Sequence, residues 1–219
     1  MVGVAFFMAT AKFERLAGSW SLTTAAAASG DRLYVVDNTI LYRVDPKTGS
    51  YERLTNRWQT RVLVGRGAKL YAWETDGALY AVSPTDGTHH RLAGTWNGVA
   101  AAAATRDGLC VAIDHSLYRV DPETGDRTQL PGRWDPVHLA GIGAFVLAWE
   151  RDGSLYRVDA RTGSFTLLPG NWPLTTAVAA ARDAVFAVDN GTLYQLDPRT
   201  RRRVPRQPRW SAASFPGGA

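Results

Sequence analysis

The chain has 219 residues and a formal net charge of +5, and 45% of its residues are hydrophobic. This composition is sufficient for one folded domain, and no uninterrupted apolar stretch approaches the ~20 residues of a membrane-spanning helix. A single cysteine, Cys110, excludes a disulfide scaffold and favours a reducing compartment, so we expect a cytoplasmic protein. The apolar start, residues 1–8, lacks the basic region of a signal peptide.

A tryptophan recurs with a period of 38 residues, at Trp20, Trp58, Trp96, Trp134, Trp172 and Trp210. A Leu-Tyr pair keeps the same period and first occurs at Leu41-Tyr42. Five equal units therefore cover residues 20–57, 58–95, 96–133, 134–171 and 172–209. A period of this length is typical of solenoids, propellers and arrays.

Each unit predicts four short strands. In the first unit, residues 22–29 are small and apolar, residues 32–36 and 40–44 are β-branched and aromatic, and residues 50–54 alternate polar with apolar. A two-residue hairpin turn is predicted between the second and third strands, where every unit has Asp or Asn: Asn38, Asp76, Asp114, Asp152 and Asn190. A second tight hairpin is predicted at residues 45–49, Asp-Pro-Lys-Thr-Gly, and at its equivalents.

A lone four-stranded meander cannot bury both of its faces, whereas radial stacking buries the sheets against one another. The predicted fold is therefore all-β: one domain over residues 1–219, forming a five-bladed β-propeller of four-stranded antiparallel blades. Alanine-rich first strands, at residues 24–28, 100–104 and 177–181, fit innermost strands crowded around a narrow axis.

The repeat resembles the kelch-type β-propeller repeat. The likeness rests on Leu33-Tyr-Val-Val36 and on the segment from Leu41 to Leu54, which contains Asp45-Pro-Lys-Thr-Gly49. The unit is shorter than the usual kelch repeat, and Asp37-Asn38 stands where a glycine doublet is expected. By blade count the chain is also similar to the tachylectin-like five-bladed lectins. Both resemblances imply a fold, and a fold does not specify a function.

The two ends leave the closure of the ring open. Residues 10–19 predict a ring-closing outer strand, in which residues 12–17 complete the last blade and displace Arg203–Pro208. The alternatives are sequential blades with a loose N-terminal strand, or a fragment of a larger propeller, because Trp210–Ser214 resembles the start of a sixth unit. Residues 201–219 are interpreted as a basic tail, and with few interleaved aromatics they do not favour a nucleic-acid partner.

The motifs give no sign of catalysis, of a metal site or of a cofactor. No metal-binding spacing of His or Cys, nucleophile elbow or phosphate-binding loop is present, and the four histidines, His89, His90, His115 and His138, share no repeat register. The periodic tryptophans are interpreted as wedges between blades, with a repeated sugar-stacking platform as the alternative.

Departures from the repeat are the best pointers to a site. The second strand carries Trp-Glu only in the second and fourth units, and the first strands of these units break the alanine pattern. The predicted ligand-binding residues are Trp73, Glu74, Trp149, Glu150, Arg61, Arg66 and His138. A tryptophan beside a carboxylate suits a sugar, a cation or an arginine-bearing peptide. A recent duplication of one unit is the alternative explanation.

The predicted function is that of a non-catalytic, monomeric binding or scaffolding propeller for a protein or peptide. A carbohydrate-binding propeller is the first alternative, and a propeller lyase or glycosidase with paired carboxylates in its central funnel is the second.

Overall fold

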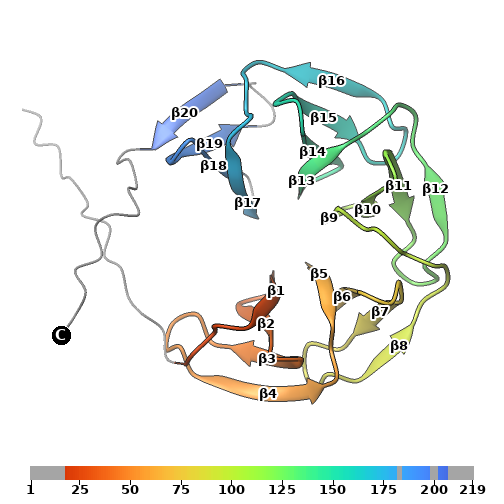
Figure 1. Ribbon diagram of the computed structural model, residues 1–219, viewed down its shortest axis with the longest axis vertical. Helices are drawn as coiled ribbons and strands as arrows, with labels where there is room; N and C mark the ends of the chain where they lie inside the picture. Colours follow the sequence, from red (N-terminus) through yellow and green to blue (C-terminus); the bar gives the residue numbers. More distant parts are fainter. Residues whose placement is uncertain (1–17, 182–183, 198–201, 207–219) are drawn as a thin grey trace, which may run out of the picture.

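The computed structural model describes residues 18–181, 184–197 and 202–206, and it shows five four-stranded antiparallel sheets arranged as a five-bladed β-propeller (Figure 1). Blade 1 contains β1 (Thr23–Ser29), β2 (Arg32–Asp37), β3 (Ile40–Val44) and β4 (Tyr51–Asn56). Blade 2 contains β5 (Thr60–Arg66), β6 (Lys69–Glu74), β7 (Leu79–Val82) and β8 (His89–Arg91). Blade 3 contains β9 (Ala101–Thr105), β10 (Gly108–Ile113), β11 (Ser116–Val120) and β12 (Arg127–Gln129). Blade 4 contains β13 (Pro136–Ile142), β14 (Phe145–Glu150), β15 (Leu155–Asp159) and β16 (Phe165–Leu168). Blade 5 contains β17 (Thr175–Ala181), β18 (Ala184–Asp189), β19 (Thr192–Asp197) and β20 (Arg202–Arg206).

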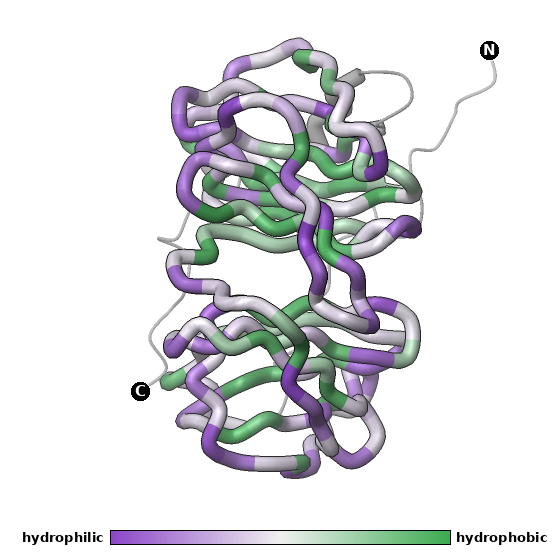
Figure 2. Tube along the Cα trace, turned by 90° about the vertical axis from the view of Figure 1, so that its right-hand side faces the viewer, coloured by the Kyte–Doolittle hydropathy of each residue, from purple (hydrophilic) through white to green (hydrophobic). Residues whose placement is uncertain are grey.

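Each blade follows the chain from the central axis outward, so the predicted meander is confirmed. Seen edge-on, hydrophobic segments run through the middle of the blades, and hydrophilic segments gather at the turns (Figure 2). The described residues form no helix that could cross a membrane.

The turn between the second and third strands has two forms. Blades 1, 3 and 5 use a two-residue turn whose residues both have positive φ, as at Asn38 (47°) and Thr39 (63°). Such a turn matches the twist of its flanking strands. Blades 2 and 4 instead use a longer turn, residues 75–78 and 151–154, in which only Gly77 or Gly153 has positive φ. The two-residue prediction is therefore confirmed for blades 1, 3 and 5 and wrong for blades 2 and 4.

The turn between the third and fourth strands keeps its predicted form in the first four blades. In blade 1 the amide of Gly49 donates to the Asp45 carbonyl at 2.8 Å, and Gly49 has a φ of 72°. The Asp45 carboxylate accepts hydrogen bonds from the amides of Lys47 (2.8 Å) and Thr48 (3.3 Å). The aspartate thus ties the turn together, while glycine supplies the left-handed residue.

Four hydrophobic cores lie between successive blades of the described chain. In each, the face that a blade turns toward the next blade, its forward face, packs against the backward face of that next blade. Between blades 1 and 2, for example, the forward face supplies Tyr34, Val36 and Leu41, and the backward face supplies Leu70 together with Trp58. The cores between blades are therefore what holds the propeller together.

The recurring tryptophans are wedges in these cores. Trp58, Trp96, Trp134 and Trp172 are 5%, 1%, 3% and 1% exposed. The indole N–H groups of Trp58, Trp96 and Trp134 reach the preceding linker, as in the hydrogen bond from Trp96 Nε1 to the Ala93 carbonyl at 3.0 Å. Trp20, at the front of blade 1, is only half-buried. The wedge interpretation is confirmed for the four buried tryptophans, and Trp210 lies outside the described residues.

The inner strands surround a central cavity of about 370 Å³. Its lining includes the small residues expected there: Ala27, Gly65, Ala102, Ala103, Ala104, Gly141 and Ala180. Blades 1 and 2, and likewise blades 3 and 4, approach so closely that a Cβ on Gly65 would lie 2.0 Å from the Ala28 carbonyl oxygen. A Cβ on Gly141 would lie 1.7 Å from the carbonyl oxygen of Ala104. The inner strands of blades 2 and 3, and of blades 4 and 5, pack less closely. The structural unit is therefore a pair of blades.

Blade 5 is completed by its own sequence. β20 pairs with β19, and Pro205 lies opposite Tyr194 on this edge strand, where a missing N–H group is tolerated. The prediction that residues 12–17 displace Arg203–Pro208 from this position is wrong, and only part of 201–219 can be a tail. Residues 1–17 lie outside the described residues.

The blades form an open arc. Each inner strand packs against the inner strand of the next blade along the chain, but β17 and β1 share no such interface. In Figure 1 the two end blades accordingly stand apart.

Candidate functional site

The seven predicted site residues fall into two groups rather than one pocket. Trp73, Glu74, Arg61 and Arg66 belong to blade 2, while Trp149, Glu150 and His138 belong to blade 4. Blade 3 separates the two groups (Figure 1).

The two strand tryptophans lie inside the cores between blades. Trp73 and Trp149 are both 0% exposed. Each meets the wedge of the next blade edge to face, Trp96 at 6.4 Å and Trp172 at 6.5 Å between ring centroids. Their indole N–H groups have no hydrogen-bond partner in the described chain. Their role in ligand binding stays a prediction, but such burial weighs against direct stacking on a ligand.

The neighbouring carboxylates anchor the backbone where the chain enters an inner strand. Glu74 accepts hydrogen bonds from the Gln59 amide and the Thr60 hydroxyl, both at 2.5 Å, and Glu150 accepts one from the Asp135 amide at 2.6 Å. Asp37 and Asp189 bind the corresponding amides in blades 1 and 5. Burial raises the pKa of Glu74 and of Glu150, and the hydrogen bonds oppose this rise.

The remaining predicted residues have different surroundings. Arg66 donates to the carbonyl oxygens of Thr105 (3.1 Å) and Arg106 (2.9 Å), and His138 Nε2 lies 3.2 Å from the Thr175 carbonyl. Both side chains therefore bridge the more widely spaced blade pairs. Arg61 is exposed and lines a shallow depression between blades 1 and 2.

One of the predicted residues lines a groove that the sequence analysis missed. This blade 2 groove has a volume of about 470 Å³ and is lined by Thr55, Asn56, Arg57, Trp58, Glu74, Asp76, Tyr80 and His89. A tryptophan does stand beside Glu74 here, but it is the wedge Trp58. The exposed Asp76 adds a second carboxylate, which accepts a hydrogen bond from the Ala78 amide at 2.9 Å.

An aromatic triplet forms one wall of the blade 2 groove. Trp58 meets Tyr80 at 5.8 Å and His89 at 4.9 Å, and Tyr80 meets His89 at 5.5 Å, all edge to face. Blades 1 and 4 build the same triplet with Tyr51 and Phe165 in the place of His89.

Blade 3 shows what else can occupy this place. There the Arg127 guanidinium lies 5.2 Å from the Trp96 ring and 5.0 Å from the Tyr118 ring. The Trp-Tyr pair of this fold therefore accepts a guanidinium, as the negative faces of aromatic rings predict.

The linker that enters the blade 2 groove departs from the repeat. Four linkers have a glycine with positive φ two residues before the wedge tryptophan: Gly18, Gly94, Gly132 and Gly170. Asn56 replaces it before blade 2, and Arg57 adopts a φ of 74° instead. A non-glycine residue in this region costs roughly 1–2 kcal/mol, and such strain concentrates at functional sites. Comparing Thr55-Asn56-Arg57-Trp58 with Ala93-Gly94-Thr95-Trp96 would have exposed this departure.

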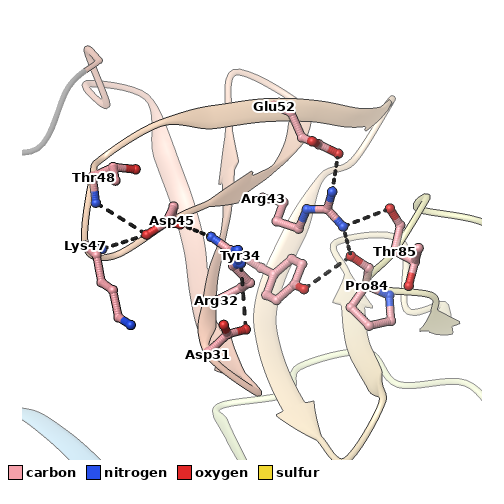
Figure 3. A network of polar contacts seen from close by, with 10 residues as sticks. All are labelled: Asp31, Arg32, Tyr34, Arg43, Asp45, Lys47, Thr48, Glu52, Pro84 and Thr85. Atoms are coloured by element: carbon pink, nitrogen blue, oxygen red, sulfur yellow. Dashed lines mark hydrogen bonds and ion pairs between the residues drawn. The ribbon is translucent and has the colours of Figure 1, made fainter.

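A second polar cluster, at the opposite end of the blade 1 and blade 2 sheets, is structural (Figure 3). Arg32 pairs with Asp45, and Arg43 pairs with Glu52 at 2.7 Å. Arg43 also donates to the Thr85 carbonyl at 3.1 Å. Because its cations are matched by carboxylates and carbonyls of the same two blades, this cluster joins the blades and is a poor candidate for a ligand site.

Comparison with known proteins identifies the fold and no family. No protein-family model matches the chain, and no curated protein matches it significantly. The chain is similar to the crystal structure of the computationally designed Ika8 protein, with a TM-score of 0.62 and 21% identity, over 86% of this chain and 62% of that one. It thus spans less than two thirds of the designed protein. It is also similar to a chain in the crystal structure of a nidogen/laminin complex, with a TM-score of 0.67 and 11% identity, over 85% and 80% of the two chains. These likenesses establish a β-propeller.

Proposed function

We propose that this protein is a non-catalytic binding or scaffolding propeller that recognises a protein or peptide through the blade 2 groove. Propellers in general fit such a role, and one similar chain comes from a complex of two proteins, nidogen and laminin. We also propose that its repeat is kelch-like. The observation that supports the site is the coincidence of two carboxylates, an aromatic wall and a strained linker. Among the linkers that the structure describes, this is the one that departs from the repeat.

The groove's chemistry suits a basic side chain. Asp76 and Glu74 can accept hydrogen bonds from a guanidinium, and the rings of Trp58 and Tyr80 provide an apolar wall beside them. Arg127 in blade 3 shows the matching contact within the molecule itself. We therefore propose a peptide segment that presents an arginine.

Asp76→Asn tests this proposal. Peptides selected on an array are measured by fluorescence anisotropy, each beside its Arg→Gln version. Loss of a charge-assisted hydrogen bond should weaken binding by about tenfold or more, and the Arg→Gln peptides should lose a similar factor. Asp152→Asn, at the same turn position of blade 4, is the matched control and should bind like wild type.

Two results would contradict the proposal. One is an equal loss of affinity in Asp76→Asn and Asp152→Asn, because the effect would then not belong to the blade 2 groove. The other is binding to a glycan array that Asp76→Asn abolishes, which would favour the carbohydrate-binding alternative.

A further inference from the structure

A second hollow adjoins the blade 2 groove. This depression between blades 1 and 2 has a volume of about 630 Å³ and is largely apolar. The residues that line it are Leu22, Thr24, Asn38, Thr39, Trp58, Gln59, Thr60, Arg61 and Thr75. Trp58 lines both hollows, and the consecutive residues 74, 75 and 76 alternate between them. A ligand in the blade 2 groove therefore lies beside this depression.

Backbone hydrogen bonds fix the walls of the depression. The Trp58 amide donates to the Thr39 carbonyl at 3.0 Å, and the Thr75 amide donates to the Gln59 carbonyl at 3.0 Å. A turn of blade 1, the linker and a turn of blade 2 are thereby joined. Thr39 holds a φ of 63°, which is strained for a β-branched residue. The depression is thus preformed, and strain of this kind concentrates at functional sites.

Leu22 gives the depression an exposed apolar side chain. It is 58% exposed, although its amide donates to the Asp37 carboxylate at 2.9 Å and its carbonyl accepts from the Asn38 amide at 3.3 Å. Blade 5 repeats this leucine as Leu174. The three middle blades carry smaller residues at this register: Thr60, Gly98 and Pro136. Because its backbone is already held in place, Leu22 can gain from burial against a ligand.

Arg61 supplies the charge of the depression. Among the described residues of the lining it alone is charged, and no hydrogen bond or ion pair joins its exposed side chain to another described residue. It is the extra residue of a β-bulge between Thr60 and Val62, and bulges re-aim side chains. The other blades have uncharged residues at this register: Thr23, Val99, Val137 and Thr175. The guanidinium is therefore a departure from the repeat that can receive a carboxylate from outside.

We propose that the depression is the second half of a peptide site. It receives an apolar side chain and an adjacent Asp or Glu of the same peptide whose arginine enters the blade 2 groove. The apolar side chain packs on Leu22 and Trp58, and the carboxylate pairs with Arg61. The two hollows differ in charge, since carboxylates line one and a guanidinium lines the other, so together they fix the direction of the peptide. This inference rests on the proposed function, because it concerns the same peptide.

A peptide array gives the first test. Peptides with one fixed arginine and randomised flanking positions are screened against wild type. The selected peptides should carry an apolar residue and an adjacent Asp or Glu on one side of the arginine. Selection of arginine with no preference at the flanking positions would overturn the proposal.

Charge reversal at Arg61 gives a sharper test. Arg61→Glu should weaken a selected peptide by about fivefold or more, as loss of an exposed ion pair predicts. It should regain affinity for the same peptide with lysine in place of the acidic residue. Arg133→Glu, at an exposed arginine of blade 4, is the control. Fluorescence anisotropy measures all of these affinities.

Asp76→Asn distinguishes failure of this inference from failure of the proposed function. It should weaken both peptides alike, because their arginine is unchanged. If Arg61→Glu binds both peptides like Arg133→Glu while Asp76→Asn still weakens them, the depression is no part of the site and the blade 2 groove stands alone. If Asp76→Asn has no effect, the proposed function fails and this inference fails with it.

Leu22→Ser tests the apolar half of the depression. Loss of the buried leucine surface should weaken the selected peptide by about fivefold or more. Leu174→Ser is the matched control, because Leu174 is 55% exposed at the same register and its amide likewise donates to an aspartate, Asp189. It should bind like wild type. An equal loss in both variants, or no loss in either, would overturn the proposal.

Discussion

At the scale of single residues, burial separates core from candidate site. Trp73 departs from the repeat as a functional residue would, yet its ring lies wholly inside the core between blades 2 and 3. His89 and Asp76 are less conspicuous in the sequence, but both are exposed in a groove. Departure from a repeat therefore indicates a site only where the side chain also reaches the surface.

Trp73→Val should cost about 3 kcal/mol of unfolding free energy, because it leaves a cavity in a close-packed core. Blade 1 carries Val36 at this register, but there the neighbouring side chains of the core pack around a valine. Urea denaturation measures the loss, and Tyr51→Val, at a side chain that is 50% exposed, is the control. Unchanged stability together with impaired binding would restore Trp73 as a site residue.

Two carboxylates should give opposite pH profiles. Hydrogen bonds from the amides of Glu123 and Thr124 lower the pKa of Asp121 below its ordinary 3.8, so Asp121 adds stability above that pH and loses it as the pH falls. Burial raises the pKa of Glu150 above its ordinary 4.5. The stability that Glu150 contributes in its protonated form is therefore fully present below pH 4.5 and is lost as the pH rises through the raised pKa.

Asp121→Asn should therefore destabilise the protein near neutral pH and have progressively less effect in acid. Glu150→Gln should gain stability relative to wild type as the pH rises above 4.5. Urea midpoints between about pH 3 and pH 7 measure both differences. Parallel profiles for the two variants would show that one of these environments is misassigned.

At the scale of elements, the strands and turns were predictable, but the pairing of blades was not. The tryptophan period of 38 residues is constant, which suggests five equal units. The second strands, however, begin 37 residues apart between blades 1 and 2 and 39 apart between blades 2 and 3, so the differences cancel. Aligning Leu33-Tyr34 with Leu70-Tyr71 would have revealed the longer turn at Gly77. The blade 2 groove was harder to predict from the sequence, because a linker and a turn that are separate in the sequence meet there across a core.

Gly141→Ala should destabilise the protein by about 3 kcal/mol or more, because overpacking here presses a methyl group on the Ala104 carbonyl. Gly143→Ala is the matched control. A Cβ there meets open space, and alanine at its φ of 57° costs only roughly 1–2 kcal/mol. Thermal denaturation compares the two. Equal losses would show that blades 3 and 4 can move apart at little cost.

At the scale of the whole molecule, stability depends on what covers the two end blades. Each described core joins neighbours along the chain, so the middle blades are covered on both sides. The end blades depend on whatever meets their open faces.

Ending the chain after residue 201 should do more damage than ending it after residue 207. The shorter chain loses β20 and leaves the edge of β19 unpaired, which invites association between molecules. We expect a lower thermal midpoint and light scattering that grows with concentration. The longer truncation product, which retains β20, is the control. Equal behaviour of the two chains would mean that β20 adds little to blade 5.

The alternation of close and wide blade pairs also sets a condition on any closed ring built from these blades. Around a closed circle, two kinds of blade can alternate without a fault only if their total number is even. Adding or deleting one 38-residue unit would place two blades of the same kind side by side. Either an inner-strand glycine would then face no close neighbour, or an inner-strand alanine would press against the carbonyl of the preceding inner strand. Changes in the gene that keep this alternation inside the arc would therefore add or remove two units at a time.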